Sequence, residues 1–143
     1  MKRVERSVTV QKSLPEVWSY LSDFRSTNDW DPGTVSTERV SGDGGIGTVY
    51  RNTSKFLGKE TELTYTVVDL KPERMISLRG ENDTVTTTDT LTLARTGSAT
   101  TVHYAAEFAF KGRARYTEPL LSFPLKKLGD DAIASLGETL SEL

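Results

Sequence analysis

Residues 34–111 alternate between polar and apolar side chains with a period of two, in stretches joined by short gaps. Each gap holds Gly, Pro, Asn or Asp, which are typical of tight turns. Because parallel neighbours need a crossover of about a dozen residues, gaps this short predict an antiparallel meander. The predicted strands cover residues 34–41, 46–55, 60–70, 74–81, 85–96 and 100–111.

The composition supports strands, and the helical signals lie near the two ends of the chain. Threonine (20) and valine (11), which favour strands, far outnumber alanine (8). Val4–Val10 alternates as a further strand, and Ser13 and Glu16 have the spacing of a capping box at a helix start. A second short helix is expected over Asp23–Asn28.

A leucine-rich stripe predicts one long C-terminal helix, from about Ala114 to Glu142. Apolar residues recur there every three or four positions, as on one face of a helix. Pro119 and Pro124 fall in its first third, which should therefore be broken or kinked.

These elements predict an α+β chain forming a single domain over residues 1–143. A curved antiparallel sheet of six to seven strands would wrap around the long C-terminal helix, with two short helices between the first two strands. A curved sheet touches such a helix closely at one end and gapes at the other, so a pocket is expected between them.

Composition and charge exclude several classes of function. With no cysteine and one histidine, the chain offers no disulfide scaffold or thiolate metal site, and no metal or other cofactor is expected. The net charge of −2 argues against a nucleic-acid partner. The longest stretch without charged residues, Thr96–Ala106, is too short for a transmembrane segment of about 20 residues. With no signal peptide after Met1, we expect a cytoplasmic protein.

Short motifs spread over nearly the whole chain carry a family resemblance. They include Val8-x-Val10, Pro15-Glu16-Val17-Trp18-x-x-Leu21, Trp30-Asp31-Pro32, Gly45-Ile46-Gly47-Thr48 and Val67-x-x-Leu70-x-Pro72-Glu73-Arg74. The chain resembles the START-like (SRPBCC, helix-grip) superfamily, and within it the bacterial polyketide cyclase/dehydrase and lipid-transport group. The resemblance implies a helix-grip fold around a ligand cavity. It implies no particular ligand and no universal catalytic motif, because the scaffold serves many ligands.

Strand parity assigns the side chains that face the predicted pocket. Leu91 and Leu93 face inward, so Thr87 and Asp89 on the same strand do too. On the last strand the apolar set faces inward, which turns His103 outward as a solvated residue. The candidate ligand-binding residues are Phe24, Trp30, Tyr50, Tyr65, Leu78, Thr87, Asp89, Tyr104, Phe108, Leu120, Leu121 and Pro124.

Asp89 is the one candidate for chemistry. An inward carboxylate would hydrogen-bond a ligand hydroxyl or act as a general acid/base. Alternatively it pairs with a tyrosine or arginine, faces water, or lies outward after a bulge. The inward tyrosines likewise either pack in the core or line a partly wet pocket.

The two ends of the chain supply the predicted rim. Phe24 and Trp30 are expected at the pocket rim, and the proline-kinked start of the last helix is expected to be a lid or simply a shaped helix entry. Residues 111–127 carry five basic side chains against Glu118, a net +4 that either contacts an anionic membrane transiently or forms a solvated face.

Three functions follow. The first is a binding module for a hydrophobic or aromatic small molecule, lipid or polyketide-like. The second is a cyclase or dehydratase that uses Asp89, and the third is a protein-interaction domain without a ligand.

Overall fold

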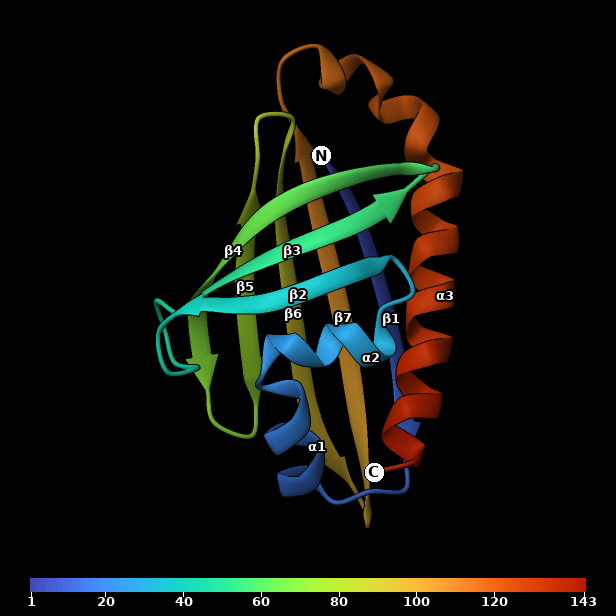
Figure 1. Ribbon diagram of the computed structural model, residues 1–143. Coiled ribbons are helices and arrows are strands. Elements are labelled where there is room, and N and C mark those ends of the chain that lie inside the picture. The colour runs from blue at the N-terminus through green and yellow to red at the C-terminus, as the bar shows by residue number, and fades with distance from the viewer.

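The structure is a computed structural model that describes residues 1–143, and its centre is one seven-stranded antiparallel sheet in the order β1-β7-β6-β5-β4-β3-β2 (Figure 1). All six strands predicted within residues 34–111 form, and the predicted α+β helix-grip architecture is confirmed. The strands are β1 (Lys2–Val10), β2 (Thr34–Ser41), β3 (Val49–Phe56), β4 (Lys59–Lys71), β5 (Met75–Glu81), β6 (Val85–Thr96) and β7 (Ala99–Phe110).

Between β1 and β2 the chain forms α1 (Leu14–Leu21), a 3₁₀ turn η1 (Phe24–Ser26) and α2 (Thr27–Trp30). Ser13 occupies the N-cap position of α1, but its side chain makes no capping hydrogen bond. Only its carbonyl oxygen accepts from the Val17 amide, at 3.1 Å. The predicted capping box is therefore wrong, and Ser13 starts the helix through its extended backbone.

The break predicted in the first third of the C-terminal helix is confirmed, whereas the predicted α-helical start near Ala114 is wrong. Residues Gly112–Leu121 form a 3₁₀ segment, η2, and the α-helix α3 covers Ser122–Ser141. Pro119 lacks the amide that an α-helix needs at that position. Pro124 lies in the first turn of α3, where a missing amide costs nothing.

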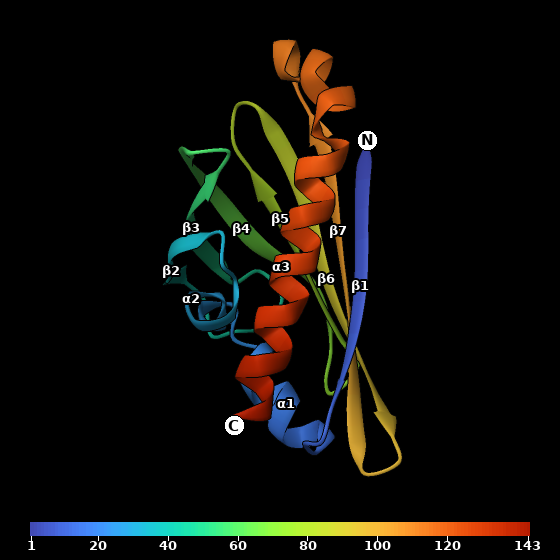
Figure 2. The ribbon, with the colours of Figure 1, turned by 90° about the vertical axis from the view of Figure 1, so that its right-hand side faces the viewer.

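Helix α3 runs lengthwise along the sheet and lies close to β1 (Figure 2). A Cβ on Gly129 would lie 2.4 Å from Cγ1 of Val4, so glycine is what permits this approach. Beyond Gly129, Ala132, Leu136 and Leu140 join the main hydrophobic core. The C-terminal part of α3 is therefore packed tightly against the sheet.

None of the helices is both long and apolar enough to cross a membrane.

Candidate functional site

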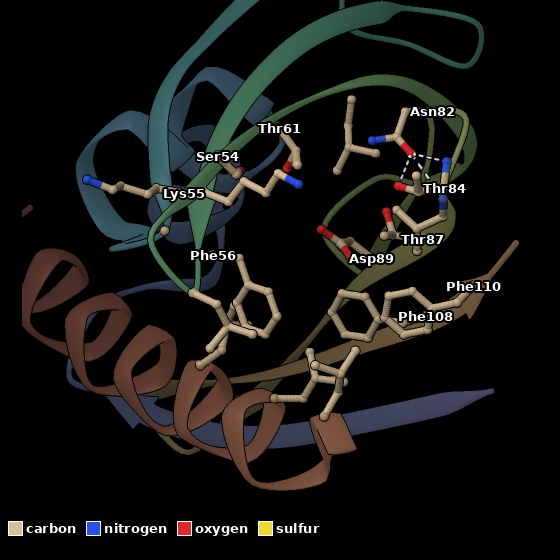
Figure 3. A pocket seen from close by; sticks show the side chains of 18 of the residues that line it. Ser54, Lys55, Phe56, Thr61, Asn82, Thr84, Thr87, Asp89, Phe108 and Phe110 are labelled. Atoms are coloured by element: carbon tan, nitrogen blue, oxygen red, sulfur yellow. Dashed lines mark hydrogen bonds between the residues drawn. The ribbon is translucent and has the colours of Figure 1, made fainter. Parts of the chain in front are cut away.

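A cavity of about 340 Å³ lies between the concave face of the sheet and the N-terminal part of α3 (Figure 3). Leu121 at the end of η2 and Leu125 and Leu128 on α3 close it from the helix side. The sheet lines it with alternate residues of β4, β6 and β7, as expected for side chains on one face. Those residues are Thr61, Leu63 and Tyr65, then Val85, Thr87 and Asp89, then Tyr104, Phe108 and Phe110.

Small residues occupy two inward positions of the central strands, where they accommodate the side chains of the cavity wall. Gly80 on β5 is paired with Thr87, and a Cβ there would lie 2.6 Å from Cε1 of Tyr65. Asp89 is paired with Ala106 on β7, whose methyl group is fully buried. The side chains of Tyr65 and Thr87 therefore pack directly against the backbone of Gly80.

Asp89 is the polar centre of the cavity, and Figure 3 shows its carboxyl directed into the open space. Thr87 Oγ1 donates to the hydroxyl of Tyr65 at 3.3 Å beside it. Burial raises the pKa of Asp89 to about 7; the charge of Asp31 adds to the shift and the Tyr65 hydroxyl opposes it.

Asp31 lines the same cavity from the loop between α2 and β2. Its carboxylate accepts from Thr34 Oγ1 at 2.9 Å and from the Gly33 amide at 3.1 Å. Burial raises the pKa of Asp31, and these two hydrogen bonds oppose the rise. Two carboxyl groups thus face one mainly apolar space, and burial raises the pKa of each.

The tyrosines of the cavity remain protonated hydroxyl donors. Burial, followed by the charge of Asp89, raises the pKa of Tyr65 and of Tyr104 well above the ordinary value. Both hydroxyls are therefore available as neutral hydrogen-bond donors near Asp89.

Of the predicted ligand-binding residues, the structure brings six together on the cavity wall. They are Tyr65, Thr87, Asp89, Tyr104, Phe108 and Leu121. Their contact with a ligand stays a prediction.

Phe24 and Trp30 are buried in the core rather than placed at the rim, so that predicted position is wrong. The ring of Phe24 lies 5.6 Å from that of Tyr50 and 4.8 Å from that of Tyr65. Trp30 meets Tyr104 edge-on at 5.9 Å and donates its indole N–H to Ser26 Oγ at 3.1 Å. These rings therefore contact the cavity residues Tyr65 and Tyr104 from within the core.

The remaining predicted residues lie outside the cavity. Tyr50 and Leu78 point inward but are fully enclosed by the core. The Leu120 side chain is 78% exposed, and Pro124 is not part of the lining. Neighbouring positions of a helical segment point in different directions, so turning Leu121 inward turns Leu120 out.

Sequence reasoning missed Asp31 and Phe56 as lining residues. Asp31 belongs to a loop, where no period assigns a direction, and its place before Pro32 marks only the end of a helix. Phe56 has the inward parity of β3, and extending that alternation to the strand end finds it.

His103 lies on the outer face of the sheet, as predicted. Its Nδ1 is 2.7 Å from Ser7 Oγ and its Nε2 is 3.2 Å from Glu5 Oε1. His103 does not line the cavity, which lies on the other face of the sheet.

The sheet, the gripping helix and the internal cavity define a helix-grip protein with a ligand-sized space. The family model "Polyketide cyclase / dehydrase and lipid transport" matches residues 1–140, and the chain belongs to this family. Membership implies a cavity for a hydrophobic ligand and is compatible with both cyclase and lipid-transport roles. A search of curated protein sequences finds no significant match.

Solved structures share the fold at low sequence identity. The chain is similar to the ZhuI aromatase/cyclase from Streptomyces sp. R1128, with a TM-score of 0.82 and 18% identity over 96% of this chain and 92% of that one. A START superfamily protein from Mycobacterium smegmatis gives 0.75 and 16%, covering 98% and 94%. Truncated norcoclaurine synthase from Thalictrum flavum gives 0.66 and 22%, covering 94% and 92%.

The raised pKa of Asp89 predicts that protonation of this residue stabilises the fold. Between about pH 4, the ordinary aspartate pKa, and pH 7 the unfolded chain loses this proton first, so the free energy of unfolding falls with rising pH. Asp89→Asn has no carboxyl to ionise, so its free energy of unfolding should not fall in this way. Chemical denaturation should show the variant about 1–4 kcal/mol more stable than the wild type at pH 8 and nearly equal to it at pH 4.

Asp83→Asn is the matched control, because Asp83 is exposed in the β5–β6 turn. It should show no gain that grows with pH. An Asp89→Asn effect of equal size at both pH values would contradict a proton held in the cavity.

Proposed function

We propose that this protein binds a compact, mainly apolar molecule in the cavity between the sheet and α3. The supporting observation is the cavity itself, a partly open space of about 340 Å³ with leucine and aromatic walls and a few polar groups. Ligand pockets commonly span about 300–1,000 Å³, so this one is small. A ring compound fits it better than an extended lipid chain.

The aromatic walls favour a flat ligand. Phe108 and Phe110 lie nearly parallel, with ring centroids 6.4 Å apart and an interplanar angle of 12°, and Phe56 faces them across the space in Figure 3. Offset stacking on such rings adds to the free energy of burial. Tyr65, Thr87 and Asp89 then give the polar group of the ligand one fixed position.

Filling the cavity should abolish binding. We expect 2-naphthol to raise the melting temperature of the wild type by several degrees, because a ligand that binds only the folded state stabilises it. Leu128→Trp places a large ring in the space, and the variant should show no such rise. Differential scanning fluorimetry measures both.

Leu120→Trp is the control, since Leu120 carries the same side chain outside the cavity. It should respond to 2-naphthol as the wild type does. An undiminished response of Leu128→Trp would place the ligand elsewhere.

Acid–base catalysis on the bound molecule is a second candidate, favoured by the pKa of about 7 for Asp89. A group with a pKa near neutrality can both give and take a proton at working pH. The neutral hydroxyls of Tyr65 and Tyr104 could polarise a carbonyl oxygen beside it. This arrangement suits a cyclisation or dehydration, the activity in the family's description.

For this candidate, native mass spectrometry would first identify a molecule that copurifies with the protein. A cyclase or dehydratase should convert it, or its open-chain precursor, with loss of one water. Asp89→Asn should slow that step about 10²-fold or more, as measured by mass spectrometry of the product. An unchanged rate would leave binding as the function.

We also propose that the outer surface near η2 contacts an anionic membrane, from which an apolar ligand could enter. Leu57, Leu120 and Phe123 expose 66%, 78% and 77% of their surface. The only acid of the basic segment 111–127, Glu118, pairs with the N-terminal amine at 2.8 Å. Lys111 and Lys127 pair with Glu81 and Asp131, whereas Arg113, Arg115 and Lys126 form no ion pair. Exposed apolar side chains near these three free cations match the charge and interior of an anionic bilayer.

Vesicle cosedimentation tests this contact. The wild type should bind phosphatidylglycerol-containing vesicles, bind pure phosphatidylcholine vesicles weakly, and lose binding in high salt. Leu120→Glu should lose it, whereas Ile46→Glu, at a loop residue exposed by 66%, should keep it. Equal loss in both variants would contradict a specific surface.

A further inference from the structure

The cavity holds two carboxyl groups, and neither forms an ion pair with a cation of the protein. Asp31 and Asp89 both line the space, and neither takes part in any ion pair of the structure. Lys55 and Lys59 line the cavity from the β3–β4 hairpin, and neither is within ion-pair distance of these carboxyls. The cavity therefore contains two carboxyl groups that form no ion pair within the protein.

Such a pair can be accommodated in two ways. A buried carboxylate without a partner costs several kcal/mol, so it either takes up a proton or receives a cation from outside. Asp31 already accepts two hydrogen bonds, from Thr34 and Gly33, that favour its charged form. Asp89 has only the Tyr65 hydroxyl to favour its charged form, and its carboxyl faces the open space in Figure 3.

The surroundings of Asp89 suit a ligand cation. The hydroxyls of Tyr65 and Thr87 can accept hydrogen bonds from an ammonium group, and Phe108 offers a ring face to a positive charge. An anionic head group would instead meet two acids in a medium that screens charge poorly.

We propose, on the basis of the binding function above, that the ligand is a protonated amine carried on a flat apolar body. Its ammonium group would lie against the carboxyl of Asp89, with Asp31 as the second negative group. Its rings would lie between Phe108 and the leucines of α3. A fatty acid or other carboxylate of similar size is disfavoured by the same two charges.

Binding of the ammonium group moves one proton in a defined direction. When Asp89 is protonated, it releases its proton to solvent as the cation arrives, and a carboxylate–ammonium pair forms. The titratable groups around it are Asp31 before β2, Tyr65 on β4 and Tyr104 on β7, with Lys55 and Lys59 farther along the wall. Amine affinity should therefore rise between pH 6 and pH 8, because the pKa of Asp89 is about 7.

Three probes of nearly equal shape test the proposal: 2-naphthylmethylamine, 2-naphthalenemethanol and 2-naphthoic acid. Titration calorimetry at pH 8 should show the amine binding about tenfold tighter than the alcohol or better, and the acid binding weakest. At pH 6.5, repeating the amine titration in buffers of different ionisation enthalpy should reveal proton release. Asp89→Asn should keep alcohol binding and lose the preference for the amine, whereas Asp83→Asn should keep both.

The outcomes separate this inference from the function on which it rests. If the alcohol binds as tightly as the amine, or the acid binds tightest, the cavity binds ring compounds but the amine assignment is wrong. If none of the three compounds gives a heat of binding or raises the melting temperature, the proposed binding of flat ring compounds is itself overturned. The amine assignment then fails with it. Amine affinity that does not change between pH 6 and pH 8 in the wild type would also overturn it, without need of any variant.

Discussion

The unequal contact of α3 with the sheet creates the cavity between them. Past Gly129 the helix packs into the core through Ala132, Leu136 and Leu140. Before it, Leu125 and Leu128 face open space instead. The close approach at Gly129 holds the helix against β1, so the gap on its N-terminal side is a fixed feature of the packing.

Pro119 limits the length of the C-terminal α-helix. Pro119 prevents the stripe of leucines from extending as α-helix toward β7, and the chain passes from β7 to α3 as the 3₁₀ segment η2. A regular helix over the whole stripe would present more side chains to the sheet. The break instead leaves a few leucines over the cavity and turns Leu120 and Phe123 out to solvent.

The fold and the cavity could be predicted from the sequence only where a segment has a regular pattern of polar and apolar residues. Alternation placed Asp89 and Thr87 on the inner face of β6, because a strand has only two faces. Periodicity gives direction but not depth, so Phe24 and Trp30 were expected at a rim and are core residues. Asp31 lies in a loop without a period, and only the folded chain brings it to the cavity of Asp89.

The position of the polar groups explains how one scaffold can serve many ligands. Thr87 and Asp89 alternate with residues of the outer face on a strand whose backbone pairs with β5 and β7 whatever its side chains are. Their replacement changes the chemistry of the cavity while the sheet and the gripping helix stay the same. Fold similarity at 18% identity therefore shows a shared scaffold alone, and the chemistry of the cavity follows from the residues of this chain. Two carboxyls without an ion-pair partner at that place are the reason for proposing that ligand charge, more than ligand shape, decides what this cavity binds.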